Sequence, residues 1–194
     1  LLLAPGSDGA VDGFLLGNNI DPAGAYALFV LRDWPGFDGK KDAFVQAAKF
    51  ARERCGLQPI FFALEPNRDL PPSREVARSL GFDCPMLSAP ADEKLIIGMM
   101  KKMRVVVSMR LHALIFASSV AAPLVAVSYD PKVTGFMHYI GQKHCVYFED
   151  VTAEKLCGLI SGALSDPAEY SVEHLRALAA QNEEIARKLL EEAT

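Results

Sequence analysis

Short segments that are apolar at every position alternate along this chain with longer amphipathic segments, and this pattern constrains the fold most. Tyr26 to Leu31 is an apolar run of strand length, and Lys40 to Cys55 follows it with Phe44, Ala47 and Ala51 at helical spacing. Strands that are apolar on both faces are typical of parallel sheets whose connecting helices cover both sides. The pattern therefore predicts an α/β fold, a Rossmann-like parallel sheet with helices on both faces.

The same alternation repeats along the chain. Ser73 is suited to the N-cap of a second helix. Asp130, Pro131 and Gly141 are suited to the N-cap, the first position and the stop of a later one. We expect strands at residues 26–31, 59–64, 84–88, 104–108, 124–128 and 145–148, and helices at 40–55, 73–80, 92–103, 111–121, 132–140, 152–164 and 171–194.

Two parts are expected along the chain. Residues 1–24 are rich in Gly, Asp, Asn and Pro and predict an irregular lead-in or linker remnant. Residues 25–194 predict one Rossmann-like domain, since 194 residues suffice for a single core. The first three residues carry no initiating Met and no signal-peptide features, so we expect the carboxy-terminal part of a longer polypeptide.

Composition narrows the classes of partner. A net charge of -4 and a pI near 5.6 argue against a basic surface that coats nucleic acid. The four cysteines are scattered, with no C-x-x-C pair and no His at ligand spacing, so no metal site is expected. The most apolar run, Leu114 to Val127, is interrupted by Pro123 and two serines and is too short for a transmembrane helix.

Ligands of open α/β sheets bind beyond the carboxyl ends of the strands, so the residues that follow each strand are the candidates. Arg110 and His112 follow the strand at 104–108, with Leu111 between them. An arginine there matches a carboxylate or phosphate, and a histidine can move protons near neutral pH. The alternative is structural: His112 caps the helix and Arg110 pairs with a local carboxylate.

The next strand ends at Tyr129, Asp130 and Lys132, and neighbouring strands can bring Lys132 toward Arg110. Capping by Asp130, packing by Tyr129 and a solvated Lys132 explain these residues equally well. Arg32, after the first strand, is a candidate second cation.

Trp34 is a candidate stacking wall beside Arg32. Glu65 and Asp69 are candidate carboxylates of the site, although the E-P-N-R-D turn is also ordinary loop chemistry. No G-x-G-x-x-G, Walker A or G-x-S-x-G motif occurs, which excludes classical dinucleotide, P-loop and serine-hydrolase sites.

Three segments together resemble the polysaccharide pyruvyl transferase family, and its CsaB-type enzymes of bacterial cell-wall polysaccharide in particular. They are M-R-L-H-A-L-I-F-A at Met109 to Ala117, A-P-L-V-A-V-S-Y-D-P-K-V at Ala122 to Val133, and G-F-M-H-Y-I-G at Gly135 to Gly141. The resemblance implies a two-lobed, glycosyltransferase-B-like enzyme of which this chain is the carboxy-terminal lobe. The final helix, 171–194, would then pack against a missing amino-terminal lobe.

The resemblance also implies an activity, the transfer of pyruvyl from phosphoenolpyruvate to a sugar of a cell-wall polysaccharide or its lipid-linked precursor, forming a ketal. Phosphoenolpyruvate is then a co-substrate, and no cofactor is implied. His112 would be the catalytic acid or base, and Arg110 and the Leu111 backbone would bind the donor, helped by Arg32 and Lys132. The enzyme would be cytoplasmic, at most peripheral at the inner membrane face, and this chain alone would be inactive or weakly active.

One position departs from the family pattern. Ser108 stands where glycine is expected before the M-R-L-H run, so its hydroxyl is a candidate for the pocket. Two other functions stay open. One is a nucleotide-sugar glycosyltransferase or epimerase lobe, with Glu149 and Asp150 as ribose-binding carboxylates. The other is a non-catalytic binding module.

Overall fold

Six parallel strands form one sheet in the order β3-β2-β1-β4-β5-β6. The computed structural model describes residues 3–166 and 172–192. This arrangement confirms the predicted Rossmann-like α/β sheet. The strands are β1 (Tyr26–Val30), β2 (Gln58–Ala63), β3 (Met86–Ser88), β4 (Val105–Ser108), β5 (Leu124–Ser128) and β6 (Cys145–Tyr147).

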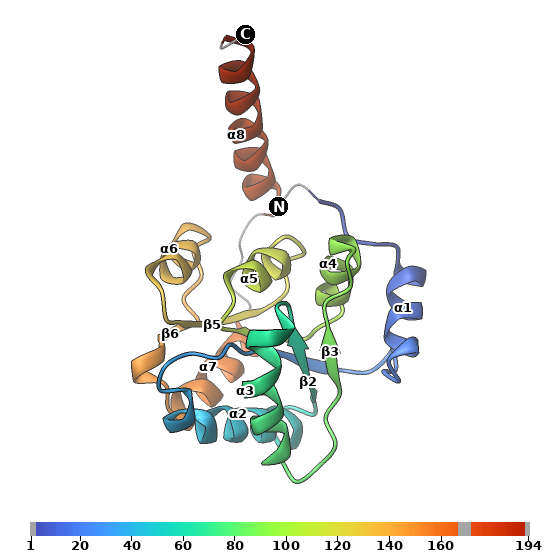
Figure 1. The fold of residues 1–194 in the computed structure, drawn as a ribbon, viewed down its shortest axis with the longest axis vertical. Helices are drawn as coiled ribbons and strands as arrows, with labels where there is room; N and C mark the ends of the chain where they lie inside the picture. The colour runs from blue at the N-terminus through green and yellow to red at the C-terminus, as the bar shows by residue number, and fades with distance from the viewer. Residues whose placement is uncertain (1–2, 167–171, 193–194) are drawn as a thin grey trace.

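Helices cover both faces of the sheet (Figure 1). The first group, α2, α3 and α7, packs on one face, and the second, α1, α4, α5 and α6, on the other. The bounds are α1 (Asp8–Gly17), α2 (Lys41–Glu53), α3 (Pro66–Arg78), α4 (Glu93–Lys101), α5 (Leu111–Ser118), α6 (Pro131–Tyr139), α7 (Ala153–Ser165) and α8 (Val172–Glu192), with short 3₁₀ turns η1 (Phe37–Gly39) and η2 (Phe148–Asp150).

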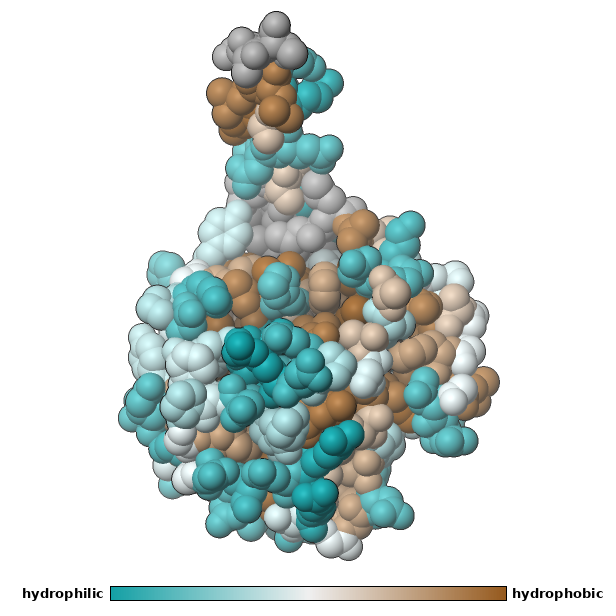
Figure 2. Space-filling model, in the orientation of Figure 1, coloured by the Kyte–Doolittle hydropathy of each residue, from teal (hydrophilic) through white to brown (hydrophobic). Residues whose placement is uncertain are grey.

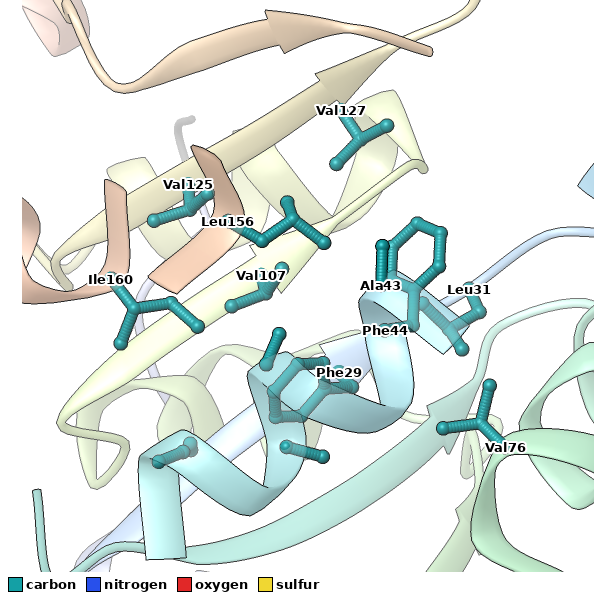
Figure 3. Close-up of a cluster of buried hydrophobic side chains, with 14 of the residues drawn as sticks. Phe29, Leu31, Ala43, Phe44, Val76, Val107, Val125, Val127, Leu156 and Ile160 are labelled. Atoms are coloured by element: carbon teal, nitrogen blue, oxygen red, sulfur yellow. The ribbon is translucent and has the colours of Figure 1, made fainter. Parts of the chain in front are cut away.

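Successive residues of the central strands are buried in two separate cores, because side chains alternate between the faces of a sheet. Phe29 and Val107 lie with α2 and α7 in the core drawn in Figure 3. Their neighbours Leu28 and Val106 belong to the core under α1, α4 and α5. All four side chains are fully buried, which explains why these strands are apolar at every position.

The chain before β1 is not irregular throughout, so the prediction for residues 1–24 is wrong over α1. The Ser7 side chain accepts a hydrogen bond from the Ala10 N–H, and Val11 and Leu15 are buried against the sheet side of the helix. Glycine and aspartate hid this four-residue spacing in the sequence. Gly98 of α4 permits the close approach, since a Cβ there would lie 2.5 Å from Val11 Cγ2.

Helix α3 begins at Pro66, seven residues before the predicted N-cap. Ser73 is buried inside the helix, where its hydroxyl donates to the Asp69 carbonyl at 2.6 Å. Pro72 has no N–H, so the carbonyl of Arg68 is released from the helix, and it accepts the Asp33 N–H at 2.7 Å. Pro72 thus frees a carbonyl that ties α3 to the end of β1.

The order of the strands reverses between β1 and β4, which are hydrogen-bonded neighbours. The chain leaves β1 toward α2 on one face and leaves β4 toward α5 on the other. In open α/β sheets this switch point leaves a crevice at the carboxyl ends of the strands. Arg32 and Arg110 follow the two strands there, as predicted.

The predicted punctuation of α6 is confirmed. The Asp130 carboxylate accepts the Lys132 N–H at 3.0 Å, Pro131 is the first helical residue, and Gly141 turns the chain at φ 68°.

Helix α8 extends away from the rest of the chain in Figure 1, and Figure 2 shows apolar side chains near its far end. Ile185, Leu189 and Leu190 are exposed there. The predicted ends of this helix, residue 171 and residues 193–194, lie outside the described residues. Of the helices in the described ranges, none combines the length and apolar character that a membrane crossing requires.

Candidate functional site

A hollow of about 330 Å³ opens beside the switch point, and we call it the switch-point hollow. Residues that follow β1, β2, β4 and β5 line it, so four strand ends converge on one place. Figure 2 shows strongly hydrophilic side chains gathered on this side of the molecule, near the beginning of α3. The lining residues are Arg32, Glu65, Arg110, Leu111, His112, Tyr129 and Lys132.

Arg110 is held in place by its own backbone and by Ser108. The Arg110 N–H donates to Ser108 Oγ at 2.8 Å, and the same hydroxyl donates to the Arg110 carbonyl at 3.0 Å. Ser108 is fully buried and does not line the hollow, so the expectation that its hydroxyl faces a ligand is wrong. The serine instead braces the turn in which Arg110 is the N-cap of α5.

Two carboxylates meet the Arg110 guanidinium. Both Nη1 and Nη2 donate to Glu65 Oε2 at 3.1 Å, and Nη1 lies 3.4 Å from Asp69 Oδ1. Arg110 and Asp69 are buried, whereas the Glu65 side chain is 47% exposed. The buried cation is thus balanced by one fixed carboxylate and one at the mouth of the hollow.

The pKa values of the two carboxyl groups are shifted in opposite directions by their environments. The hydrogen bond from Arg110 lowers the pKa of Glu65, and the charges of Arg110, Arg68 and Arg32 add to this effect. Burial raises the pKa of Asp69, although the Glu65 N–H, the Arg110 charge and the Leu64 N–H oppose it. Asp69 Oδ2 accepts those two N–H groups at 2.8 and 2.9 Å, so it anchors the turn as well as Arg110.

Arg32 brings a second guanidinium to the hollow. Its Cζ lies 5.6 Å from the centre of the Tyr129 ring, and that ring lies 4.3 Å from the ring of Trp34. The Nε of Arg32 is buried and has no hydrogen-bond partner among the described residues. An unpaired buried donor costs on the order of 1–3 kcal/mol, which an anionic ligand in the hollow would recover.

Lys132 lines the hollow from the first turn of α6, and its Nζ lies 3.3 Å from Asp130 Oδ2. The Lys132 N–H and side chain lower the pKa of Asp130. Asp130 does not line the switch-point hollow; it caps α6 and lines a neighbouring hollow of about 290 Å³.

Leu111 and His112 are the first two residues of α5, and both line the hollow. The first intrahelical bond of α5 is donated by the Leu114 N–H to the Arg110 carbonyl, so the amides before it point out of the helix end. Such amides and the helix dipole favour an anion. His112 is exposed, and its side chain is accessible at the hollow.

All seven lining residues were expected at the site from the sequence, and the fold brings them together. Three other expected residues, Ser108, Asp69 and Asp130, lie outside the lining and act on it through Arg110 or Lys132. The sequence gives no signal for this support, because a residue that holds a neighbour in place carries no motif. In the described residues, no group of three or more His, Cys, Asp or Glu is arranged to hold a metal ion.

Solved structures share this fold at low sequence identity. A glycosyl transferase of family 9 from Veillonella parvula matches with a TM-score of 0.61 and 12% identity, over 86% of this chain and 54% of that one. The E. coli ADP-heptose lps heptosyltransferase II gives 0.61 and 12%, over 84% and 53%. A putative UDP-N-acetylglucosamine 2-epimerase from Listeria monocytogenes gives 0.62 and 15%, over 93% and 48%.

This chain therefore spans about half the length of these solved structures, and the likeness establishes the fold alone. A search among curated proteins finds no match. A family model does match, however, over residues 3–131, which is well over half of the chain. That range contains the ends of β1, β2 and β4 and the residues that line the hollow as far as Tyr129. The chain belongs to the polysaccharide pyruvyl transferase family.

Proposed function

We propose that the switch-point hollow binds phosphoenolpyruvate and that its pyruvyl group is transferred to a sugar of a cell-wall polysaccharide or its lipid-linked precursor. The observation that carries this proposal is the pair of guanidiniums, Arg32 and Arg110, in one hollow beside the start of α5. Phosphoenolpyruvate has a carboxylate and a phosphate, and each matches an arginine fork. The amides at Leu111 and His112 add donors for the same anion.

The reaction that we propose balances without a cofactor. A proton adds to the methylene carbon of phosphoenolpyruvate, which makes the neighbouring carbon electrophilic. Two sugar hydroxyls then form C–O bonds to that carbon, the C–O bond to phosphate breaks, and the products are a cyclic ketal and inorganic phosphate. The two hydroxyl protons balance those taken up by the methyl group and by phosphate. His112, exposed in the hollow, moves protons in these steps.

We further propose that the active enzyme includes an amino-terminal lobe that this chain lacks and that α8 packs against it. Two facts support this. The chain spans about half the length of the solved structures that share its fold, and Ile185 and Leu189 are exposed on α8. The complete enzyme would work in the cytoplasm and meet a lipid-linked acceptor at the inner membrane face. This chain alone would turn over little or no substrate.

Donor binding is tested on this chain by calorimetry and thermal shift with phosphoenolpyruvate. We expect saturable binding that Arg32→Gln weakens at least tenfold. Arg32 makes no ion pair in the described residues, so this variant should keep the fold. Arg74→Gln, on the exposed side of α3, is the matched control and should bind like the wild type. Equal affinity in the wild type and Arg32→Gln would reject the assignment of the hollow.

The role of His112 is tested in the complete enzyme with phosphoenolpyruvate and a cell-wall glycolipid acceptor. Phosphate release should fall by about 100-fold or more in His112→Ala, the order of magnitude of general acid-base catalysis. Donor binding should persist, because Arg32 and Arg110 remain. Undiminished phosphate release in the variant would remove His112 from the mechanism.

A nucleotide-sugar donor is the second candidate, because Glu149 and Tyr129 line a hollow of about 290 Å³ beside the switch-point hollow. A carboxylate there suits ribose hydroxyls. The solved structures of similar fold include glycosyl transferases and a putative epimerase. Thermal shift by a nucleotide sugar without a shift by phosphoenolpyruvate would favour this candidate.

A further inference from the structure

We propose that a second hollow, formed by the β1–α2 loop and the start of α3, binds a pyranose ring of the acceptor; this rests on the proposed function. We call it the loop hollow. It measures about 480 Å³, within the range of roughly 300–1,000 Å³ that small-molecule sites occupy. Asp33, Trp34, Asp38 and Arg68 provide its chemistry.

Two contacts connect the loop hollow to the switch-point hollow. The Trp34 ring, which lines the first, lies 4.3 Å between centroids from the Tyr129 ring, which lines the second. The Arg68 Nε of the first lies 3.4 Å from Glu65 Oε1 of the second. The two hollows therefore adjoin each other, and these contacting side chains lie between them. A pyranose in the loop hollow would be a ring of the acceptor next to the one that reacts with the donor.

The lining suits a neutral polyol better than a second anion. A pyranose has a flat face of C–H groups, which packs on an aromatic ring such as Trp34, and a rim of hydroxyls that donate hydrogen bonds. Asp33 and Asp38 are exposed, and neither carboxylate forms an ion pair or a side-chain hydrogen bond within the described residues. Their oxygens can accept hydrogen bonds from sugar hydroxyls, and their charge repels phosphate and carboxylate.

The loop that forms the hollow is held before any ligand binds. The Asp33 N–H donates to the Arg68 carbonyl at 2.7 Å, and the Phe37 N–H donates to the Trp34 carbonyl at 2.9 Å. Phe37 is buried and stacks on Phe44 of α2 at 5.3 Å between ring centres. A site that is ordered in advance loses less entropy when the sugar binds.

Gly36 makes the turn possible, because its φ of 85° lies in the left-handed region that other residues rarely adopt. Lys40 closes the far side of the loop, since its Nζ donates to the Glu149 carbonyl at 2.5 Å and to the Val151 carbonyl at 3.2 Å. The loop is therefore fixed at its start, its turn and its end. The fixed loop therefore holds Trp34 in place before a sugar binds.

Trp34 is the one tryptophan of the chain, so its fluorescence reports on this hollow directly. The probes are methyl pyranosides of the gluco, galacto, manno and N-acetylglucosamine series, titrated into this chain. We expect at least one to change the Trp34 fluorescence saturably and to receive saturation transfer from the protein by NMR. Trp34→Ala should abolish the transfer to the ring protons, and Trp34→Phe should keep part of it.

Carboxylate variants separate this proposal from donor binding. Asp38→Asn should weaken pyranoside binding at least fivefold and leave the affinity for phosphoenolpyruvate unchanged. Arg32→Gln should weaken phosphoenolpyruvate binding and leave the affinity for pyranosides unchanged, because Arg32 lines the other hollow. Asp83→Asn, an exposed aspartate that lines neither hollow, is the control.

Pyranoside binding without phosphoenolpyruvate binding would keep the loop hollow and reject the donor assignment. Phosphoenolpyruvate binding without saturable pyranoside binding, up to the solubility of the sugars, would overturn the loop hollow. The loop hollow would also be overturned if Asp38→Asn and Trp34→Ala bind pyranosides with the affinity of the wild type.

Discussion

Asp69 is the buried carboxylate beside Arg110, and Asp69→Asn tests its role. In the folded chain Oδ2 accepts the Leu64 and Glu65 N–H groups, and Oδ1 lies 3.4 Å from Arg110 Nη1. An asparagine keeps one oxygen for the two amides. Its NH₂ group then faces the guanidinium, so an attraction becomes a repulsion while the shape hardly changes.

The size of the effect follows from these contacts. Removing one partner of a buried ion pair costs about 3–5 kcal/mol when the other charge is left alone. Glu65 still receives both hydrogen bonds from Arg110, and the burial that raises the pKa of Asp69 is a cost of keeping this carboxylate charged, so part of the loss is offset. We therefore expect a loss of about 2 kcal/mol, which lowers Tm by about 4–8 °C for a chain of this size.

The assay is reversible denaturant unfolding of this chain, with calorimetric titration of phosphoenolpyruvate at a temperature where both proteins are folded. Asp69→Asn should lose donor affinity as well as stability, because the NH₂ group repels the Arg110 guanidinium from the position in which Asp69 holds it. A double-mutant cycle with Arg110→Met should give a coupling free energy of at least about 1 kcal/mol. Asp83→Asn removes a charge from the surface and serves as the control.

Two results would refute the reasoning. If Asp69→Asn unfolds within about 0.5 kcal/mol of the wild type, the carboxylate is not the anchor of this turn. If the effects of Asp69→Asn and Arg110→Met are additive, the two side chains are energetically independent despite their distance.

Further predictions concern the mouth of the hollow and the packing of α7. Glu65→Gln removes the charge that competes for Arg110, so phosphoenolpyruvate should bind several-fold tighter by calorimetry; weaker binding would mean that Glu65 contacts the ligand. Burial lowers the pKa of His144, so the unfolded chain takes up the proton more readily. The free energy of unfolding therefore carries no penalty from His144 above the unfolded pKa of about 6.5, and it decreases as pH falls from that value through the lower folded pKa. His144→Gln should flatten the decrease in the denaturation midpoint between about pH 7 and about pH 5, and an unchanged slope would contradict this. A Cβ at Gly162 would lie 3.0 Å from His144 Nε2, whereas one at Gly158 would meet nothing within 4 Å. Gly162→Ala should thus unfold about 1–2 kcal/mol more easily than Gly158→Ala, and equal stability would show that the ring can move.

The fold could be predicted well because its signals are local. Runs such as Tyr26–Val30 are apolar at every position, and helix ends such as Asp130, Pro131 and Gly141 carry their own capping chemistry. The predictions for α1 and for the start of α3 were wrong because the local chemistry there is ambiguous. Glycine and aspartate obscure the spacing of α1, and the E-P-N-R-D segment at the start of α3 is also ordinary loop chemistry.

Some residues of the candidate site could be identified from the sequence, and others could not. Arg110 and His112 could be identified from the sequence, because they follow a strand and match a family motif. The braces around Arg110 could not. Ser108 and Asp69 act through hydrogen bonds whose partners are set by how the turns pack.

By itself, the sequence determined the alternation of strands and helices, the strand ends that carry polar groups, and the family. These properties depend on side-chain periodicity and on residues near one another in the chain. Only the tertiary structure decided that the strand order reverses between β1 and β4, and that Arg32 and Arg110 therefore face one hollow. It also decided that Trp34 contacts Tyr129, which is far away in sequence. The reason is physical: register and crossover direction follow from burying both faces of the whole sheet at once, and no local segment contains that information.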